Sequence, residues 1–377
     1  MAATILTGNN NAIRIPDTIM HYEVFNQLFW RQAGLMGVDI GGENSLSGNR
    51  AYYPIVEKEE FRKNRGKGGD TIRMRMARKL TTAPTFEGTD PTGSMEEQSF
   101  DYFDALVGVV RHQTVLNESR VSQGRVNFDV LKENIQGLGR HGQEFVDQDI
   151  FQAYYNGYSR ILAQGATSAT VTTAIGNTLK TAVKHPNWYY ASGEAKGWTS
   201  DKEATCNNNL YKFGTAAINK AKGIMKVLNF VPMRWKGQST FLCVCSEEQL
   251  QDLYQDPVWQ SNAEKADVRG TGNPLWQGLD EGGLYNGVFV MGNNGVHHAN
   301  RDDVPGGENV HRAIFSGAHA IAFGLDGETK YTTLKEDKFG SREGRGYEMV
   351  YGASRLDWTS VGNQSSLIMS TFAQTAA

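Results

Sequence analysis

The spacing of hydrophobic positions changes along the chain, and over residues 127–155 it has the period of a helix. Apolar side chains recur there every three or four positions: Leu131, Ile135, Leu138, Phe145, Val146, Ile150 and Tyr154. This spacing predicts one long helix, with Asn127 as a candidate N-cap and a length of roughly 43 Å. Gly137, Gly139 and Gly142 interrupt it, and because glycine weakens a helix we expect a bend or a close neighbour there.

Other periods predict shorter elements in the second half of the chain. Helical spacing over 210–228 predicts an amphipathic helix, and the apolar run 239–245 predicts a buried strand. Ser246 is placed to begin a further helix that reaches Tyr254 and ends at Asp256-Pro257. We also expect a hairpin of 288–291 with 296–298 around a Gly292–Gly295 turn, and short strands over 313–323, 330–334 and 347–358.

The first half of the chain is more extended. Residues 51–116 read as strands and loops, with strict alternation of Met and Arg within 71–79 and a more apolar strand over 105–116. Residues 157–209 are rich in small polar residues and predict loop with short elements. Helices mixed with strands, without a regular βαβ period or an internal repeat, indicate the α+β class.

The N-terminal 50 residues are polar except for one amphipathic patch at 22–30, where Val24, Phe25, Leu28 and Phe29 follow helical spacing. Two interpretations are equally supported by the pattern. The patch belongs to an arm that docks on another surface, or it is an ordinary N-terminal helix.

Composition narrows the class of protein. The chain has 377 residues, 39% of them hydrophobic, which is enough for a large core in one or two domains and excludes wholesale disorder. The formal charge of -3 excludes a protein that coats nucleic acid through a strongly basic surface. The sequence has no secretory signal and no apolar run of about 18 residues, so we expect a soluble, intracellular product without a membrane partner.

Residue patterns for catalysis or ligand binding are weak. Gly137, Gly139 and Gly142 match a dinucleotide-binding spacing, but they follow a predicted helix instead of a strand. His297 and His298 would point to opposite faces of a strand, and the sparse cysteines Cys206, Cys243 and Cys245 suit buried structural roles. The sequence therefore predicts no catalytic residue, no metal ligand and no cofactor.

Charge is concentrated in one segment. Residues 58–79 hold nine basic and three acidic side chains, and the acidic, turn-forming stretch 87–97 follows. Because aromatic side chains for stacking on bases are scarce, a complementary surface on another subunit is a better match than nucleic acid. The candidate contact residues are Arg62, Lys63, Arg65, Lys67, Arg73, Arg75, Arg78 and Lys79. Gly66, Gly68 and Gly69 are candidate hinges.

Three groups of segments carry a resemblance to a known family. They are 69–80 (GDTIRMRMARKL) with 100–103 and 109–113, 249–259 (QLQDLYQDPVW) with 272–278 and 284–290, and 312–320 (RAIFSGAHA) with 345–358. In this order they resemble the major capsid proteins of tailed bacteriophages with the Hong Kong 97-type (HK97) fold. The podovirus-type major capsid family is the nearer match.

The resemblance implies a division of the chain into five parts. They are an N-terminal arm (1–50), the E-loop and flanking strands (51–116), the P-domain spine helix with an insertion-like loop (117–209), mainly the A-domain (210–320), and returning P-domain strands with the C-terminus (321–377).

The implied function is non-enzymatic self-assembly into the icosahedral shell of the virion. The implied partners are further copies in hexamers and pentamers, a portal, and scaffold or decoration proteins. The shell would form in the host cytoplasm and enclose double-stranded DNA without reading its sequence. Two alternatives stay open: an encapsulin-like cellular nanocompartment of the same fold and, more remotely, a soluble α+β hydrolase.

Overall fold

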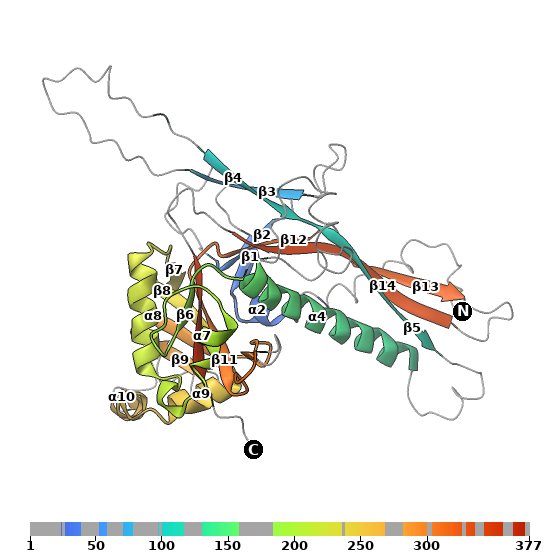
Figure 1. Cartoon of the computed structure of the whole chain (residues 1–377). Helices are drawn as coiled ribbons and strands as arrows, with labels where there is room; N and C mark the ends of the chain where they lie inside the picture. The colour runs from blue at the N-terminus through green and yellow to red at the C-terminus, as the bar shows by residue number, and fades with distance from the viewer. Residues whose placement is uncertain are drawn as a thin grey trace, which may run out of the picture.

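The computed structural model describes residues 24, 27–38, 53–58, 71–77, 97, 100–116, 130–157, 184–235, 238–267, 282–299, 304–325, 329–335, 343–356 and 365–373. Two large sheets, one long helix, several shorter helices and a small projecting ribbon make up these residues (Figure 1). The α+β class predicted from the sequence is confirmed.

The six-stranded sheet is built around one long strand. Its members are β1 (Met36–Val38), β2 (Ile55–Lys58), β5 (Gly108–Leu116), β12 (Ile321–Leu325), β13 (Lys330–Lys335) and β14 (Glu343–Arg355). Strand β14 pairs with β5 along one side and with β13 and then β12 along the other, all antiparallel. The long strands β5, β13 and β14 extend together away from the second sheet (Figure 1).

The six-stranded and seven-stranded sheets form two separate lobes, and the seven-stranded lobe also carries most of the shorter helices. Its strands are β6 (Trp188–Tyr190), β7 (Met233–Trp235), β8 (Gln238–Cys245), β9 (Gly282–Tyr285), β10 (Val288–Gly292), β11 (Val310–Ser316) and β15 (Ser366–Phe372). Its helical segments are α7 (Ser200–Ala204), the 3-10 turn η4 (Asn209–Tyr211), α8 (Thr215–Val227), α9 (Glu247–Tyr254) and α10 (Pro257–Asp267).

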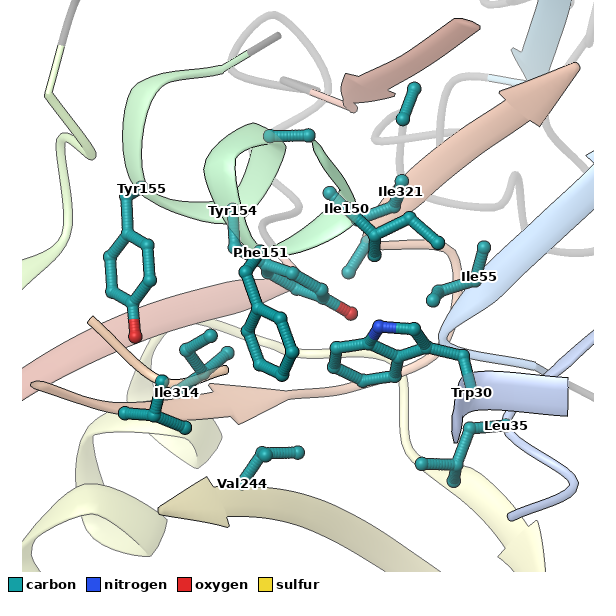
Figure 2. Close-up of a cluster of buried hydrophobic side chains, with 14 of the residues drawn as sticks. Trp30, Leu35, Ile55, Ile150, Phe151, Tyr154, Tyr155, Val244, Ile314 and Ile321 are labelled. Atoms are coloured by element: carbon teal, nitrogen blue, oxygen red, sulfur yellow. The ribbon is translucent and has the colours of Figure 1, made fainter. Parts of the chain in front are cut away.

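The long helix α4 (Val130–Asn156) joins the two sheets. Its last turns contribute Ile150, Phe151 and Tyr154, all at most 1% exposed, to a core that also contains side chains from both sheets (Figure 2). Polar contacts fix the same end: Tyr155 Oη donates to the Arg312 carbonyl of β11 at 2.7 Å. The predicted helix is confirmed, and its C-terminal end is the point where the lobes meet.

The glycines of α4 differ in their surroundings. A Cβ on Gly142 would lie 3.0 Å from Val24 Cγ2, which is the close neighbour expected from the sequence. A Cβ on Gly137 would meet nothing within 4 Å. The candidate cap Asn127 lies outside the described residues.

The amphipathic N-terminal patch belongs to the core. Val24, Leu28 and Trp30 are fully buried, and the Trp30 ring lies 5.0 Å from that of Phe151 and 5.6 Å from that of Tyr154 (centroid to centroid; Figure 2). Among the described residues, the short helix α2 (Phe29–Gln32) forms at the end of the patch. Because these three side chains are buried within their own chain, the structure favours the second interpretation for the patch, an N-terminal element packed on the core.

Helix α8 begins five residues later than its apolar spacing predicted. Leu210 lies in η4 and is 79% exposed, so it does not extend the apolar face of the helix. The start is fixed by Asp256, whose Oδ2 accepts from the Thr215 amide (2.7 Å) and hydroxyl (2.8 Å). Partial burial opposes it, but these hydrogen bonds lower the pKa of Asp256 below its usual value. Asp256 Oδ1 also accepts from the Val258 amide at 2.8 Å, so one side chain anchors the starts of α8 and α10.

Helix α9 begins as predicted. Ser246 is its N-cap, and Gln249 completes a capping box with it. By contrast, the hairpin expected around 292–295 is wrong. The turn is Asn286-Gly287, both with positive φ (46° and 71°), and it joins β9 to β10. Strand β10 then pairs in parallel with β8, which the sequence spacing could not indicate.

The apolar run 313–323 is two strands, not one. Gly317 lies between β11 of the seven-stranded sheet and β12 of the six-stranded sheet, so the chain crosses between lobes here. A Cβ on Gly317 would lie 2.4 Å from the Val231 carbonyl oxygen, and His319 has a φ of 58°. Close backbone packing therefore breaks the strand.

Candidate functional site

The predicted charged hairpin has a structural base. Strands β3 (Thr71–Ala77) and β4 (Phe100–Leu106) form a separate antiparallel two-stranded sheet, in register from Thr71 opposite Leu106 to Ala77 opposite Phe100. The ribbon projects from one side of the molecule (Figure 1). Because β4 is followed after one residue by β5, it is continuous with the six-stranded sheet, which fixes its base.

The predicted contact residues are only partly within the described chain. Arg73 and Arg75 lie in β3, where the register places Arg73 opposite Asp104 and Arg75 opposite Tyr102. The remaining candidates lie outside the described residues: Arg62, Lys63, Arg65, Lys67, Arg78, Lys79 and the candidate hinges Gly66, Gly68 and Gly69. The ribbon carries arginines on one strand and the aspartates Asp101 and Asp104 on the other.

A buried ion pair, absent from the sequence predictions, fastens the loop region before α8 to the seven-stranded sheet. Arg312 donates through Nε (2.7 Å) and Nη2 (2.8 Å) to the two carboxylate oxygens of Glu203. Both side chains are 0% exposed. Trp198 Nε1 (2.9 Å) and Ser370 Oγ (3.0 Å) donate to the same carboxylate. The Arg312 guanidinium also lies over the Trp188 ring, 5.1 Å from its centre.

This pair explains part of the segment 157–209 that showed no pattern. Glu203 comes from the short helix α7, and Arg312 stands in a fully buried strand. A lone arginine in the apolar run 310–316 was the available signal, because buried charges need a partner. Nothing in the sequence spacing identifies Glu203 as that partner.

A second polar cluster surrounds His311 at the start of α9. Its Nδ1 lies 2.7 Å from Ser246 Oγ and 3.7 Å from Glu248 Oε2, and its Nε2 lies 3.3 Å from His298 Nδ1. Burial, and then the neighbouring His298, lower the pKa of His311 to about 4, although Glu248 acts in the opposite direction. His311 is therefore neutral near pH 7.

Serine, histidine and glutamate together can form a nucleophilic site, but this cluster has another use. Ser246 is 1% exposed, and its Oγ accepts from the Gln249 amide at 3.2 Å as the cap of α9. A nucleophile must be reachable by its substrate, which the buried Ser246 is not.

His297, predicted to lie in a strand with His298, instead stacks on Tyr155 with 4.4 Å between ring centres.

The remaining chemical candidates have structural surroundings. Gly137, Gly139 and Gly142 lie inside α4, where the backbone amides are used within the helix instead of being directed at a phosphate. Cys206, Cys243 and Cys245 are free and buried, and burial holds the pKa of Cys243 well above its usual value. Within the described ranges, no three His, Cys, Asp or Glu side chains are grouped as metal ligands. Of the helices described, none is both long and apolar enough to span a bilayer.

A second histidine pair lies beside α4. His112 of β5 and His141 of α4 stack with 4.1 Å between ring centres, and His141 Nδ1 lies 3.0 Å from Tyr347 Oη. Burial and His141 lower the pKa of His112. These contacts tie the outer half of α4 to the six-stranded sheet.

Comparison with known proteins identifies the family to which this arrangement of two lobes, a bridging helix and a projecting ribbon belongs. The family model of phage capsid proteins matches residues 18–369. The chain belongs to the phage capsid protein family. No curated protein sequence matches it.

Solved capsids share the fold of this capsid protein at low sequence identity. The capsid of Ralstonia phage GP4 has a TM-score of 0.67 at 18% identity, covering 94% of this chain and 93% of that one. The cyanophage Pam1 capsid gives 0.64 at 17% identity, covering 91% and 92%. The acid-stable capsid of Helicobacter pylori bacteriophage KHP30 gives 0.60 at 12% identity, covering 90% and 91%. The HK97-type fold expected from the sequence is confirmed.

Proposed function

We propose that this phage capsid protein builds the shell of the virion as hexamers and pentamers that enclose double-stranded DNA. The observation that carries the proposal is the family match over 18–369, together with a shared fold that covers more than nine-tenths of solved phage capsid chains. In this assignment α4 is the spine helix and the β3–β4 ribbon is the base of the E-loop. The seven-stranded lobe is the A-domain, which then includes β6 and β15 in addition to the 210–320 segment expected from the sequence.

The proposed mechanism is summation of many weak contacts between copies. Each subunit in a closed shell touches several neighbours, so modest individual interfaces give a stable particle. The E-loop would supply one such contact, through the basic residues at and beyond the ribbon. The β3–β4 pair supports this role, because it projects from the molecule on a base continuous with the six-stranded sheet.

The protein acts in this proposal without catalysis. The polar clusters of the described residues serve the fold: Glu203 is paired with Arg312, and Ser246 caps α9. Portal, scaffold and decoration proteins would be further partners, and assembly would take place in the host cytoplasm.

Electron microscopy of the purified full-length protein tests the proposal. We expect closed icosahedral shells, and shells recovered from infected cells should protect DNA from nuclease. A wild-type protein that stays monomeric at high concentration contradicts the proposal. Shells that hold a host enzyme instead of DNA would indicate a cellular compartment.

Charge reversal tests the E-loop contact separately. The variant Arg62→Glu, Lys63→Glu, Arg65→Glu should fold but yield at least tenfold fewer regular shells. The charge-preserving variant Arg62→Lys, Lys63→Arg, Arg65→Lys should assemble like the wild type. Normal shells from the reversal variant would show that this basic segment does not hold a neighbour.

A further inference from the structure

A pocket beside the C-terminal half of α8 has an apolar base and a basic rim. Its volume is about 410 Å³. Phe230 and Phe241, 5% and 6% exposed, lie at its base, whereas Lys226, Asn229 and Ser239 on its lining are exposed. Such a lining suits a ligand that combines an apolar side chain with negative charge.

The two lysines of the pocket are not paired with a carboxylate of the described residues. Lys222 and Lys226 stand one turn apart on α8 and both line the pocket. Lys222 Nζ donates to the side-chain oxygen of Asn286 at 2.8 Å and to its carbonyl oxygen. Neither lysine forms an ion pair with any residue that the structure describes. Burial, and then the charge of Lys226, lower the pKa of Lys222, as expected for two cations without a carboxylate between them.

The sequence around the pocket is basic over a long distance. Residues 204–246 contain no aspartate or glutamate but six basic residues: Lys212, Lys220, Lys222, Lys226, Arg234 and Lys236. One of them, Lys212, is paired with Asp252 at 3.1 Å. Of these residues, Lys222 and Lys226 line the pocket, so we expect it to favour an anionic partner.

The opposite pattern occurs at the ribbon. Residues 80–110 contain no lysine or arginine but six acidic residues: Glu87, Asp90, Glu96, Glu97, Asp101 and Asp104. Phe86 and Met95 stand next to Glu87 and Glu96, so the segment offers carboxylates beside large apolar side chains. Glu97 is exposed, and β4 belongs to the projecting ribbon (Figure 1).

We propose that the basic pocket of α8 receives the acidic segment 86–97 of a second copy of the chain. Carboxylates of the segment would pair with Lys222 and Lys226, and an apolar neighbour would cover Phe230 and Phe241. Complementary charge of this kind selects the partner and fixes its register. The inference rests on the proposed function and deepens it, because it assigns both sides of one contact between subunits.

Reciprocal charge reversal tests the contact. Lys222→Glu with Lys226→Glu should reduce the yield of regular shells at least tenfold, and so should Glu96→Lys with Glu97→Lys. Combining all four changes should restore at least a third of the wild-type yield. Lys222→Arg with Lys226→Arg is the matched control and should assemble normally. Because Lys222 also binds Asn286, Lys226→Glu alone is a second variant that removes no hydrogen bond within the described chain.

A cross-link separates a contact between copies from one within a chain. Shells of the variant Lys226→Cys, Glu97→Cys, treated with a short bismaleimide, should give covalent multimers on a denaturing gel, and each single variant should not. A cross-linked species that runs as a monomer overturns the inference.

The outcomes also distinguish the inference from the function beneath it. Normal shells from both reversal variants overturn the pocket contact and leave the proposed function intact. Normal shells that hold less DNA after reversal of the lysines overturn it in favour of nucleic acid as the occupant. Absence of shells from the wild type overturns both.

Discussion

Replacement of Glu203 by glutamine should lower the free energy of unfolding strongly, although the two side chains have nearly the same shape. The carboxylate accepts four hydrogen bonds, two of them from Arg312, and no atom of either side chain reaches solvent. Glutamine keeps one acceptor oxygen but turns an amide group towards donors and leaves the guanidinium without a counter-charge. Breaking a buried ion pair in this way costs about 3–5 kcal/mol.

That magnitude can be converted into a measurable shift. With a urea m-value of about 2–3 kcal/mol/M, the unfolding midpoint should fall by about 1–2.5 M. Tryptophan fluorescence of the unassembled full-length protein is a suitable signal, because Trp188 and Trp198 both lie against the ion pair. The pair of Arg111 with Glu348 is the matched control, since the Arg111 side chain is 65% exposed. Arg111→Gln should cost about 0–1 kcal/mol.

A double variant tests the cause. Glu203→Leu with Arg312→Met removes both charges and should be more stable than either single variant, because the penalty comes from the unpaired charge. If Glu203→Gln shifts the midpoint no more than Arg111→Gln does, the reasoning is refuted. If the double variant is as unstable as Glu203→Gln, the lost hydrogen bonds of the carboxylate matter more than its charge.

Three further predictions concern the glycines Gly317 and Gly137, the buried His311, and the capping residue Asp256. Gly317→Ala places a methyl group 2.4 Å from the Val231 carbonyl oxygen and should destabilise the fold by about 2 kcal/mol or more. Gly137→Ala, where a Cβ would meet nothing within 4 Å, should stabilise α4 by up to about 1 kcal/mol. The urea unfolding midpoint measures both effects. The pKa of His311 is about 4 in the folded protein and 6.5 ordinarily. As the pH falls, His311 is therefore protonated in the unfolded chain before it is protonated in the folded one, and stability should be lost between about pH 6.5 and pH 4. His311→Asn should flatten this loss in urea midpoints compared at about pH 7.5 and about pH 5. Asp256→Ala removes the caps of α8 and α10 and should cost about 1–2 kcal/mol and lower the helical circular dichroism.

Each of these expectations has a contrary result. Equal midpoints for the two glycine variants would show that the crossing at residue 317 can relax. An unchanged pH dependence in His311→Asn would place the acid sensitivity elsewhere. Asp256→Asn keeps one acceptor oxygen and should be less harmful than Asp256→Ala; the reverse order would exclude capping as the cause.

Local pattern was sufficient wherever one element buries one face. The long helix follows from its three-and-four spacing, and the start of α9 from Ser246 and its capping box. The same reasoning failed where a distant residue decided the outcome. Asp256, 41 residues away, fixes where α8 begins, and close backbone packing at Gly317 divides one apolar run between two sheets.

The candidate site shows the same division. The sequence identified the charged segments and the arginines of β3, because charge and alternation are local properties. The α8 pocket could not be found that way, since its aromatic base comes from Phe230 and Phe241 while its lysines come from α8.

By itself, then, the sequence determined the type of the main helices and strands, the charge segregation and the capsid family, because periodicity, composition and motif order are properties of the chain alone. Only the tertiary structure decided which strands share a sheet, that Glu203 neutralises Arg312, and that the N-terminal patch is part of the core. The physical reason is that many segments could supply the hydrogen bonds of a strand edge or the counter-charge of a buried side chain. Packing in three dimensions selects one of them.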